Sequence, residues 1–361
     1  MIYSGLPALA VLLVAQVAPG STAAIGDAQT PAEVKAAFVK VLDRPKVALD
    51  VKSGPTVVEE ENGLIVERLS FASEKKADGV VERVPVLIVR PAKGNGRRPA
   101  VIALHGTGGS KDGMRPWLED LAKRGIIGVA IDARYQGDRA GGVKGSGAYV
   151  DAITRAWKRQ AGAPVEHPFY YDTCWDVWRT IDYLLSRDDV DPKRIGVIGI
   201  SMGGIETWLA AATDDRVAVA VPAIAVQSFR WSLDHDAWQG RANTIKGAHE
   251  AAAKDLGHDR VNAAVCRELW GKVIPGILGP FDCPSMIRLF AGRPLLILNG
   301  ERDLNCPIEG ARLAFDAAET AFKEAAADDK LKILVAPGVG HAVTPTQHRA
   351  ALDWFVQWLK P

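Results

Sequence analysis

The segment 195–203 constrains the fold of this chain most, because it takes a buried strand directly into a helix. It reads Ile-Gly-Val-Ile-Gly-Ile-Ser-Met-Gly and is followed by a helix-like stretch, 205–213. A turn this sharp forces its central residue, Ser201, into a sparsely populated backbone conformation. Glycine at Gly199 and Gly203 removes the Cβ atoms that would collide there. We therefore predict a strand, a sharp turn with an exposed serine hydroxyl at its apex, and a helix that begins beside that hydroxyl.

Apolar runs and helix-like segments alternate along most of the chain, which predicts an α/β protein with a mostly parallel central sheet and helices on both faces. The expected strands are 63–71, 80–91, 100–104, 126–132, 195–199, 217–222, 295–299 and 331–336. The expected helices are 31–43, 117–124, 173–186, 205–213, 310–323 and 346–359. In the helix 173–186, the inner face is predicted to run through Trp175, Trp178, Ile181 and Leu185.

The stretch 229–290 breaks this alternation and is expected to form a helical, cap-like insertion. It is long, rich in Trp, His and charge, and lies between two predicted strands. Insertions of this kind lie above the carboxyl ends of the strands, where ligands bind. Trp231, Trp238 and Trp270 either line a substrate pocket or form the insertion's own small core. We take Trp231 as a candidate substrate-binding residue.

The first 24 residues differ from the rest and resemble a secretory signal peptide. The segment 6–17 is almost wholly apolar and is followed by Pro-Gly-Ser-Thr-Ala-Ala, which predicts cleavage near Ala23 or Ala24. Because residues 1–5 carry no Lys or Arg, a surface-packed or disordered N-terminal helix is the alternative. The apolar run is too short for a comfortable membrane span. We expect export to the periplasm or the medium, no stable membrane anchor, and a single domain over 25–361.

Composition argues against several classes of partner. The chain has 44 Lys and Arg against 43 Asp and Glu, with no long basic block, so nucleic acid is not an expected partner. No metal is expected, because His235, His249 and His258 lack metal-ligand spacing and the cysteines form no Cys-x-x-Cys pair. The four cysteines form either one or two disulfides, with Cys266–Cys283 as one option, or buried free thiols.

A serine nucleophile needs a general base, and that base needs an acceptor that fixes its tautomer. His341 lies in the loop that follows the strand 331–336, and Asp303 lies just past the strand 295–299. Each residue alone is more typical of a turn or a surface group. Together with Ser201 they stand in the chain order Ser, Asp, His, and all three follow predicted strands at one sheet edge. We therefore predict a Ser201–His341–Asp303 triad, with Asp303 preferred over Glu301 because it lies further into its loop.

Acyl transfer also needs hydrogen-bond donors for the oxyanion that develops on the carbonyl. The N–H of Met202, directly after the serine, is one candidate. The second is expected from the loop after the strand 100–104, which reads His-Gly-Thr-Gly-Gly-Ser from His105, with Thr107 favoured over Gly108. The loop has neither a Gly-x-Gly-x-x-Gly nor a P-loop lysine pattern, so no nucleotide cofactor is expected.

These motifs together resemble the α/β-hydrolase superfamily over residues 60–361. Within it, the chain is most similar to the group of dienelactone hydrolases, acetyl xylan esterases and prolyl-oligopeptidase-like enzymes. The elbow Gly-Ile-Ser-Met-Gly-Gly and the stretch Asp-Ala-Arg-Tyr-Gln-Gly-Asp from Asp132 carry this likeness. Serine replaces the cysteine nucleophile of true dienelactone hydrolases, and no segment large enough for the propeller of prolyl oligopeptidases precedes the domain. The resemblance implies the α/β-hydrolase fold and hydrolase activity.

The loop after Asp132 is a second candidate for substrate contact. Tyr135 is taken as a substrate-binding residue, and Arg134 and Arg139 either read a carboxylate or sugar hydroxyls or belong to a solvated surface loop. The expected function is a serine carboxylesterase that acts on a small-molecule or sugar ester without a cofactor. A peptidase with the same triad and a non-catalytic ligand receptor on this scaffold are the alternatives.

Overall fold

The computed structural model describes residues 29–94 and 96–361, and the candidate signal peptide at 1–24 lies outside the described residues. Nine strands in this part of the chain form one sheet, with the order β1-β2-β3-β5-β4-β6-β7-β8-β9. Strands β1, β2, β3 and β5 pair antiparallel, and the pairs from β5 through β4 and β6 to β9 are parallel. The strands are β1 (Lys52–Glu59), β2 (Leu64–Lys75), β3 (Val81–Pro91), β4 (Arg98–Leu104), β5 (Ile127–Ile131), β6 (Val190–Ile200), β7 (Val217–Ala223), β8 (Leu295–Gly300) and β9 (Leu331–Ala336).

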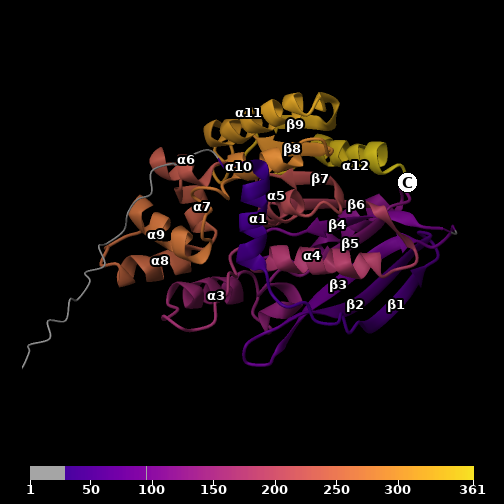
Figure 1. Ribbon diagram of the computed structural model, residues 1–361. Coiled ribbons are helices and arrows are strands. Elements are labelled where there is room, and N and C mark those ends of the chain that lie inside the picture. The colour runs from indigo at the N-terminus through magenta and orange to yellow at the C-terminus, as the bar shows by residue number, and fades with distance from the viewer. Residues whose placement is uncertain (1–28, 95) are drawn as a thin grey trace, which may run out of the picture.

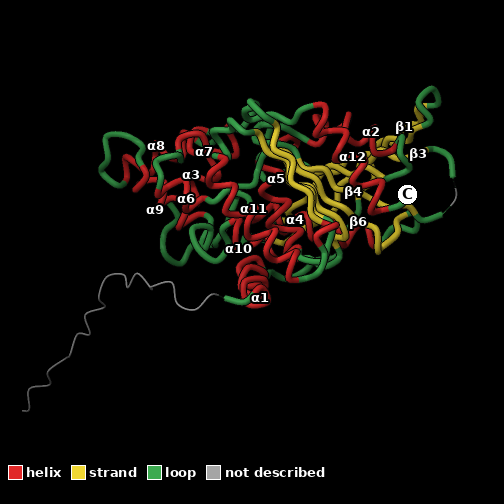
Figure 2. The backbone as a smooth tube through the Cα atoms, turned by 90° about the horizontal axis from the view of Figure 1, so that it is seen from above, coloured by secondary structure: helices red, strands yellow, loops and turns green. Residues whose placement is uncertain are grey.

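Helices cover both faces of the twisted sheet (Figure 1 and Figure 2). The central strands are buried on both sides, so alternate residues feed two apolar clusters: Ile102 of β4 points into one and Val101 into the other. Helices α1, α4, α5 and α11 pack into the first cluster, and α2 and α12 pack into the second. The main-sheet helices are α1 (Pro31–Leu42), α2 (Arg115–Ala122), α3 (Gly147–Trp157), α4 (Tyr171–Leu185), α5 (Met202–Thr213), α11 (Ile308–Glu324) and α12 (Pro345–Leu359).

The predicted insertion lies between β7 and β8 and is helical. It contains α6 (Phe229–Asp234), α7 (Gln239–Asn243), α8 (Lys246–Asp255), α9 (Ala263–Val273) and α10 (Cys283–Ile287). Helices α6 to α9 lie beyond one end of the sheet, next to α3 (Figure 1). Helix α3 packs against both α8 and α9. Helix α10 packs against α1, α5 and α11, so the insertion also contacts the helices on one face of the sheet.

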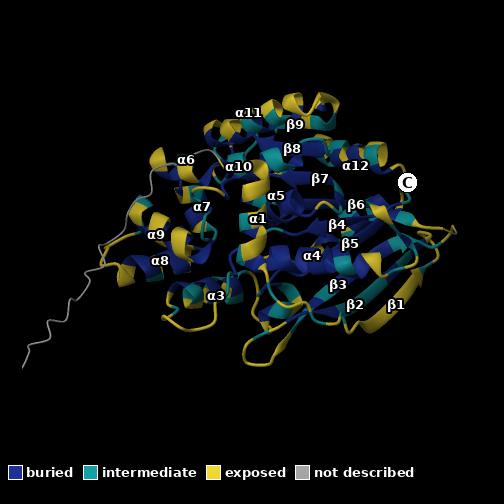
Figure 3. Ribbon diagram, viewed as in Figure 1, coloured by how far each residue is buried: buried dark blue, intermediate teal, exposed yellow. Residues whose placement is uncertain are grey.

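Strand β1 and helix α3 were not predicted from the sequence, and the prediction that Leu185 is buried is wrong. Strand β1 is exposed along almost its whole length, so its sequence carries no alternating apolar pattern (Figure 3). Helix α3 follows a glycine-rich loop and buries Tyr149, Ile153 and Trp157. Trp175, Trp178 and Ile181 form the inner face of α4 as predicted, but Leu185 is 39% exposed because it is the last residue of that helix.

Two further features of the described residues concern disulfide bonds and membrane-spanning helices. All four cysteines, Cys174, Cys266, Cys283 and Cys306, are buried free thiols, so the disulfide alternative, including Cys266–Cys283, is wrong. Across residues 29–94 and 96–361, no helix has both the length and the apolar character needed to cross a bilayer.

Candidate active site

Ser201 occupies the turn between β6 and α5 in a strained backbone conformation. Its φ of 56° and ψ of −112° place a non-glycine residue in a region that such residues rarely adopt. The neighbouring glycines are required by close approach rather than by their own dihedral angles. A Cβ at Gly199 would lie 2.0 Å from the Gly203 oxygen, and a Cβ at Gly203 would lie 2.4 Å from the Leu104 oxygen. The turn can therefore close only with glycine at both positions.

The structure brings Ser201, His341 and Asp303 together in one chain of hydrogen bonds. Ser201 Oγ lies 2.7 Å from His341 Nε2, and His341 Nδ1 lies 2.7 Å from Asp303 Oδ2. A carboxylate only accepts hydrogen bonds, so the imidazole proton is assigned to Nδ1 and Nε2 is the acceptor for the serine hydroxyl. This arrangement is the one that a serine nucleophile and its general base require.

The Asp303 carboxylate is fixed by its own loop. Its side chain is fully buried, whereas 27% of the His341 side-chain surface is exposed. Asp303 Oδ1 accepts the N–H groups of Asn305 at 2.8 Å and Cys306 at 3.2 Å, which leaves Oδ2 for the imidazole. The carboxylate therefore has one orientation, and it directs that oxygen at His341.

Glu301, the rival carboxylate, has a different set of contacts. Its Oε2 accepts the N–H of Gly338 at 2.7 Å, and its own N–H donates to the Ala336 oxygen. The Arg302 N–H donates to the Val339 oxygen in the same way. Glu301 thus joins the loop after β8 to the loop that carries His341, but its carboxylate is not bound to the imidazole.

The two predicted oxyanion donors, the N–H groups of Met202 and Thr107, differ from their neighbours in their hydrogen bonding. Among the described residues, neither the Met202 N–H nor the Thr107 N–H has a hydrogen-bond acceptor. The Gly108 N–H, the alternative to Thr107, already donates to Gln136 Oε1 at 2.5 Å. The Gly203 N–H donates to the His105 oxygen at 3.1 Å, which joins the start of the glycine loop to the turn at Ser201.

The arginines after β5 are buried ion-pair partners, so both interpretations given for them from the sequence are wrong. Arg134 binds Asp176 at 2.6 Å and Glu74 at 2.6 Å. Arg139 binds Asp176 at 2.8 Å and also pairs with Glu82. Burial alone would raise the pKa of Asp176, but the two guanidinium groups hold that pKa well below its usual range. These charges are paired with one another and are not available to a substrate.

Tyr135 is held in a polar cluster on the outer side of the same loop. Its hydroxyl donates to Glu166 at 2.9 Å and lies 3.4 Å from Lys76 Nζ. The guanidinium of Arg155 lies 5.7 Å from its ring. Over the described residues, no hydrogen bond joins Tyr135 to the Ser201–His341–Asp303 chain, so its substrate-binding role stays a prediction.

The three tryptophans of the insertion divide into two groups. Trp238 and Trp270 are buried, and Trp270 Nε1 donates to His249 Nε2 at 3.0 Å; both belong to the apolar cluster that the insertion shares with the sheet. Trp231 is half-buried and stacks on His235 at 4.3 Å. A Cβ on Gly310, at the start of α11, would lie 2.8 Å from the Trp231 ring. Trp231 thus packs between α6 and α11, and its contact with substrate stays a prediction.

In the described part of the chain, one group of side chains has its potential metal-donor atoms close together. Donor atoms of Asp303, Cys306 and His341 lie within 4.8 Å of one another. The Cys306 thiol donates to the Ile224 oxygen at 3.3 Å, and burial raises its pKa well above the usual range. A metal ligand must be the thiolate, so the protonated thiol does not suit this role.

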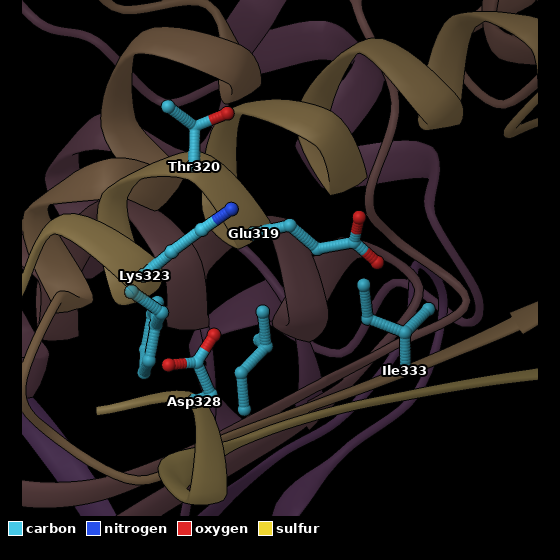
Figure 4. A pocket seen from close by; sticks show the side chains of 7 residues that line it. Glu319, Thr320, Lys323, Asp328 and Ile333 are labelled. Carbon is cyan, nitrogen blue, oxygen red and sulfur yellow. The ribbon is translucent and has the colours of Figure 1, made fainter. Parts of the chain in front are cut away.

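A surface pocket of about 560 Å³ lies between α11 and β9 (Figure 4). Its lining residues are Glu319, Thr320, Phe322, Lys323, Asp328, Leu331 and Ile333. None of them is part of the hydrogen-bonded chain at Ser201. The candidate nucleophile Ser201 and its base His341 therefore do not line this pocket.

The chain is similar in sequence to a described family of esterases and to bacterial proteins named as hydrolases and peptidases. Residues 66–230 match the model of a family described as acetyl xylan esterase (AXE1). YtaP of Bacillus subtilis (strain 168), which is provisionally named a hydrolase, is 27% identical over 77% of this chain and 84% of its own. YuxL of the same organism, named an uncharacterized peptidase, is 27% identical over 81% of this chain but only 37% of its own.

A solved structure shares the fold. An acetyl xylan esterase from Paenibacillus sp. R4 superposes with a TM-score of 0.60 at 21% identity, covering 90% of this chain and 92% of its own. The α/β-hydrolase fold expected from the sequence is therefore confirmed.

Proposed function

We propose that this chain is a carboxylic ester hydrolase of the α/β-hydrolase superfamily and that it cleaves its ester through an acyl-enzyme formed on Ser201. The observation that carries this proposal is the pair of 2.7 Å hydrogen bonds that connect Ser201 to His341 and His341 to Asp303. A hydroxyl and an imidazole at this distance can exchange a proton without rearrangement.

In the first step, His341 Nε2 takes the Ser201 proton as the serine oxygen attacks the ester carbonyl. The negative charge that develops on the carbonyl oxygen is bound by the N–H groups of Met202 and Thr107. Asp303 stabilises the imidazolium and holds its tautomer. The imidazolium then protonates the leaving alcohol. In the second step, His341 activates a water molecule, which attacks the acyl-enzyme and releases the acid.

The description of the matched family supports a proposal for the substrate class. The AXE1 description names acetyl groups on a polysaccharide, and the superposed Paenibacillus enzyme carries the same description. We assign this chain a small-molecule or sugar ester, with an acetylated sugar as the first candidate. Such a substrate is met outside the cytoplasm, which agrees with an exported protein whose segment 1–24 acts as a signal peptide.

Replacement of the nucleophile tests the mechanism. Ser201→Ala is expected to abolish turnover of p-nitrophenyl acetate, because no hydroxyl remains to form the acyl-enzyme. Ser186→Ala, the same substitution at the end of α4, serves as the matched control and should keep wild-type activity. Near-wild-type turnover in Ser201→Ala would contradict the proposed function.

The likeness to YuxL supports the peptidase alternative. Substrates that differ only in their leaving group, an alcohol or an amine, distinguish a peptidase from an esterase. An esterase is expected to cleave acetylated sugars and p-nitrophenyl esters far faster than the matching p-nitroanilides, because an amine leaves only after protonation. Comparable rates on esters and amides would favour a peptidase. A non-catalytic receptor would react with neither class and would resist a fluorophosphonate probe.

A further inference from the structure

The side chain of Gln136 connects the two segments that supply the candidate oxyanion donors. Gln136 follows β5 and is fully buried. Its Oε1 accepts the N–H of Gly108 at 2.5 Å, and its Nε2 lies 2.9 Å from the Met202 sulfur. Gly108 directly follows Thr107, and Met202 directly follows Ser201. The Gln136 amide therefore contacts Gly108, the residue after the donor Thr107, and the side chain of the other donor, Met202.

The bond to Gln136 occupies the N–H of Gly108 and leaves the neighbouring N–H of Thr107 available. Gly108 has a φ of +78°, a conformation that turns successive N–H groups in different directions. With the Gly108 N–H bound to Gln136, the preceding N–H of Thr107 remains without a partner among the described residues. An oxyanion hole is effective because its donors are oriented before the charge develops. Gln136 supplies such an orienting contact.

The segment that carries Gln136 is itself fixed to both ends of the glycine loop. At one end, the Ala133 N–H donates to His105 Nε2 at 3.1 Å. At the other end, the Asp132 carboxylate accepts the Lys111 N–H at 2.7 Å and the Lys111 ammonium at 2.8 Å. The same carboxylate accepts the Asp138 N–H at 3.0 Å. The segment 132–138, which carries Gln136, is therefore held in a fixed position relative to the glycine loop.

We propose that Gln136 is a positioning residue for the oxyanion hole, which it holds in the geometry that binds the tetrahedral intermediate. This inference rests on the proposed function. Gln136 does not touch the reacting atoms; it acts through Gly108 and Met202. Its removal should weaken binding of the intermediate and leave binding of the substrate ground state nearly unchanged.

The test compares kcat, KM and the inhibition constant of a trifluoromethyl ketone in Gln136→Met, a variant of similar volume that lacks the amide. The ketone adds to the serine and develops an oxyanion, so it reports on the hole directly. Displaced groups at an active site typically cost about 10- to 100-fold in rate. We expect kcat to fall by about that factor, the inhibition constant to rise in parallel, and KM to change less than about 3-fold.

Three further variants distinguish positioning from general damage. Gln136→Glu keeps an acceptor for the Gly108 N–H and should recover most of the lost kcat. Gln136→Asn withdraws the amide from Gly108 and gives the same readout as Gln136→Met should that variant not fold. Thr213→Val removes a buried side-chain hydrogen bond at the far end of α5 and is the control for lost stability alone.

Unchanged kcat and unchanged ketone affinity in the folded Gln136 variants would overturn this inference, and so would equal losses in kcat for Gln136→Met and Gln136→Glu. These outcomes are separate from failure of the proposed function, which is read from Ser201→Ala alone. Activity lost in Ser201→Ala but kept in Gln136→Met would leave the mechanism in place and remove only the role of Gln136.

Discussion

Glu206 is a buried carboxyl group on α5, the helix that begins beside Ser201. Its side chain is almost fully enclosed, and neither carboxylate oxygen has a hydrogen-bond partner with acceptable geometry among the described residues. Burial raises its pKa well above the usual value. The folded state therefore keeps a proton that the unfolded chain releases above a pH of about 4.5. Stability contributed by this group is present below that pH and is lost as the pH rises toward the folded pKa.

We expect Glu206→Gln to stabilise the protein at pH 8 and to have little effect near pH 5. The gain in stability at pH 8 is expected because the amide cannot ionise, which removes the free-energy cost of ionising a buried carboxyl group. Urea unfolding of both proteins at the two pH values measures it. Glu319→Gln, at an exposed position on α11, is the control. A gain that does not depend on pH would contradict this account of Glu206.

Asp303 and Glu301 offer a direct comparison of two carboxylates two residues apart. Asp303→Asn should lower kcat by about 10³- to 10⁴-fold with little change in KM, because the amide cannot hold the imidazole in the required tautomer. Glu301→Gln keeps an oxygen for the Gly338 N–H and should stay within about 3-fold of wild type. Steady-state kinetics on one ester substrate measures both variants. A larger loss in Glu301→Gln than in Asp303→Asn would reverse the assignment.

At the scale of single residues, the sequence indicated Ser201, His341 and Asp303 but not the buried residues around them. Ser201, Asp303 and His341 were predictable because each follows a strand and their order along the chain is specific. Gln136 carries no comparable signal, since its role depends on burial between two loops that are distant in sequence. Arg134 and Arg139 were misinterpreted for the same reason: their partners Asp176, Glu74 and Glu82 come from other elements.

At the scale of elements, the turn between β6 and α5 depends on the packing of α5 against β4. Gly203→Ala would bring a Cβ to 2.4 Å from the Leu104 oxygen, so the helix must move away from the sheet. We expect kcat to fall by at least about 100-fold, because Ser201 moves with the helix. Gly271→Ala on α9 is the control: a Cβ there meets nothing within 4 Å. That substitution should stabilise the protein by about 0.5–1 kcal/mol without affecting activity.

Kinetics and thermal unfolding of the two glycine variants are read together. Full activity in Gly203→Ala would show that the turn tolerates a side chain and would contradict the close approach on which the geometry of Ser201 depends.

Elements with strong apolar patterns were predictable, and those without were not. The central strands, such as Ala100–Leu104, are continuous apolar runs and were located to within a few residues. Strand β1 was missed because an exposed edge strand has no buried face to impose alternation. The helical character of the insertion was expected from its length and position, but its helix boundaries depend on contacts with α3 and α11 that sequence periodicity does not carry.

At the scale of the whole molecule, the insertion and the sheet share one apolar core. Side chains of the insertion, including Ile245 and Trp270, belong to the same buried cluster as Ile102 of β4. The Asp282 carboxylate also joins the two ends of the insertion, because it accepts the N–H of Phe229 at 2.9 Å and that of Cys283 at 2.8 Å. We propose that residues 25–361 fold as a single unit.

Scanning calorimetry of the protein should then show one unfolding transition, with equal calorimetric and van't Hoff enthalpies, because the insertion cannot unfold without exposing the core of the sheet. Two resolved transitions would contradict this proposal. If activity were lost in the first transition while the sheet stayed folded, the insertion would be a unit that folds independently.

The central claim is that one serine among all those in the chain is activated by His341. Peptide mapping by mass spectrometry after reaction with a fluorophosphonate probe tests it most directly. We predict one probe per chain, attached to Ser201, with labelling slowed by about 10³-fold or more in His341→Gln. Labelling at another residue, or labelling of Ser201 at the same rate without His341, would contradict it.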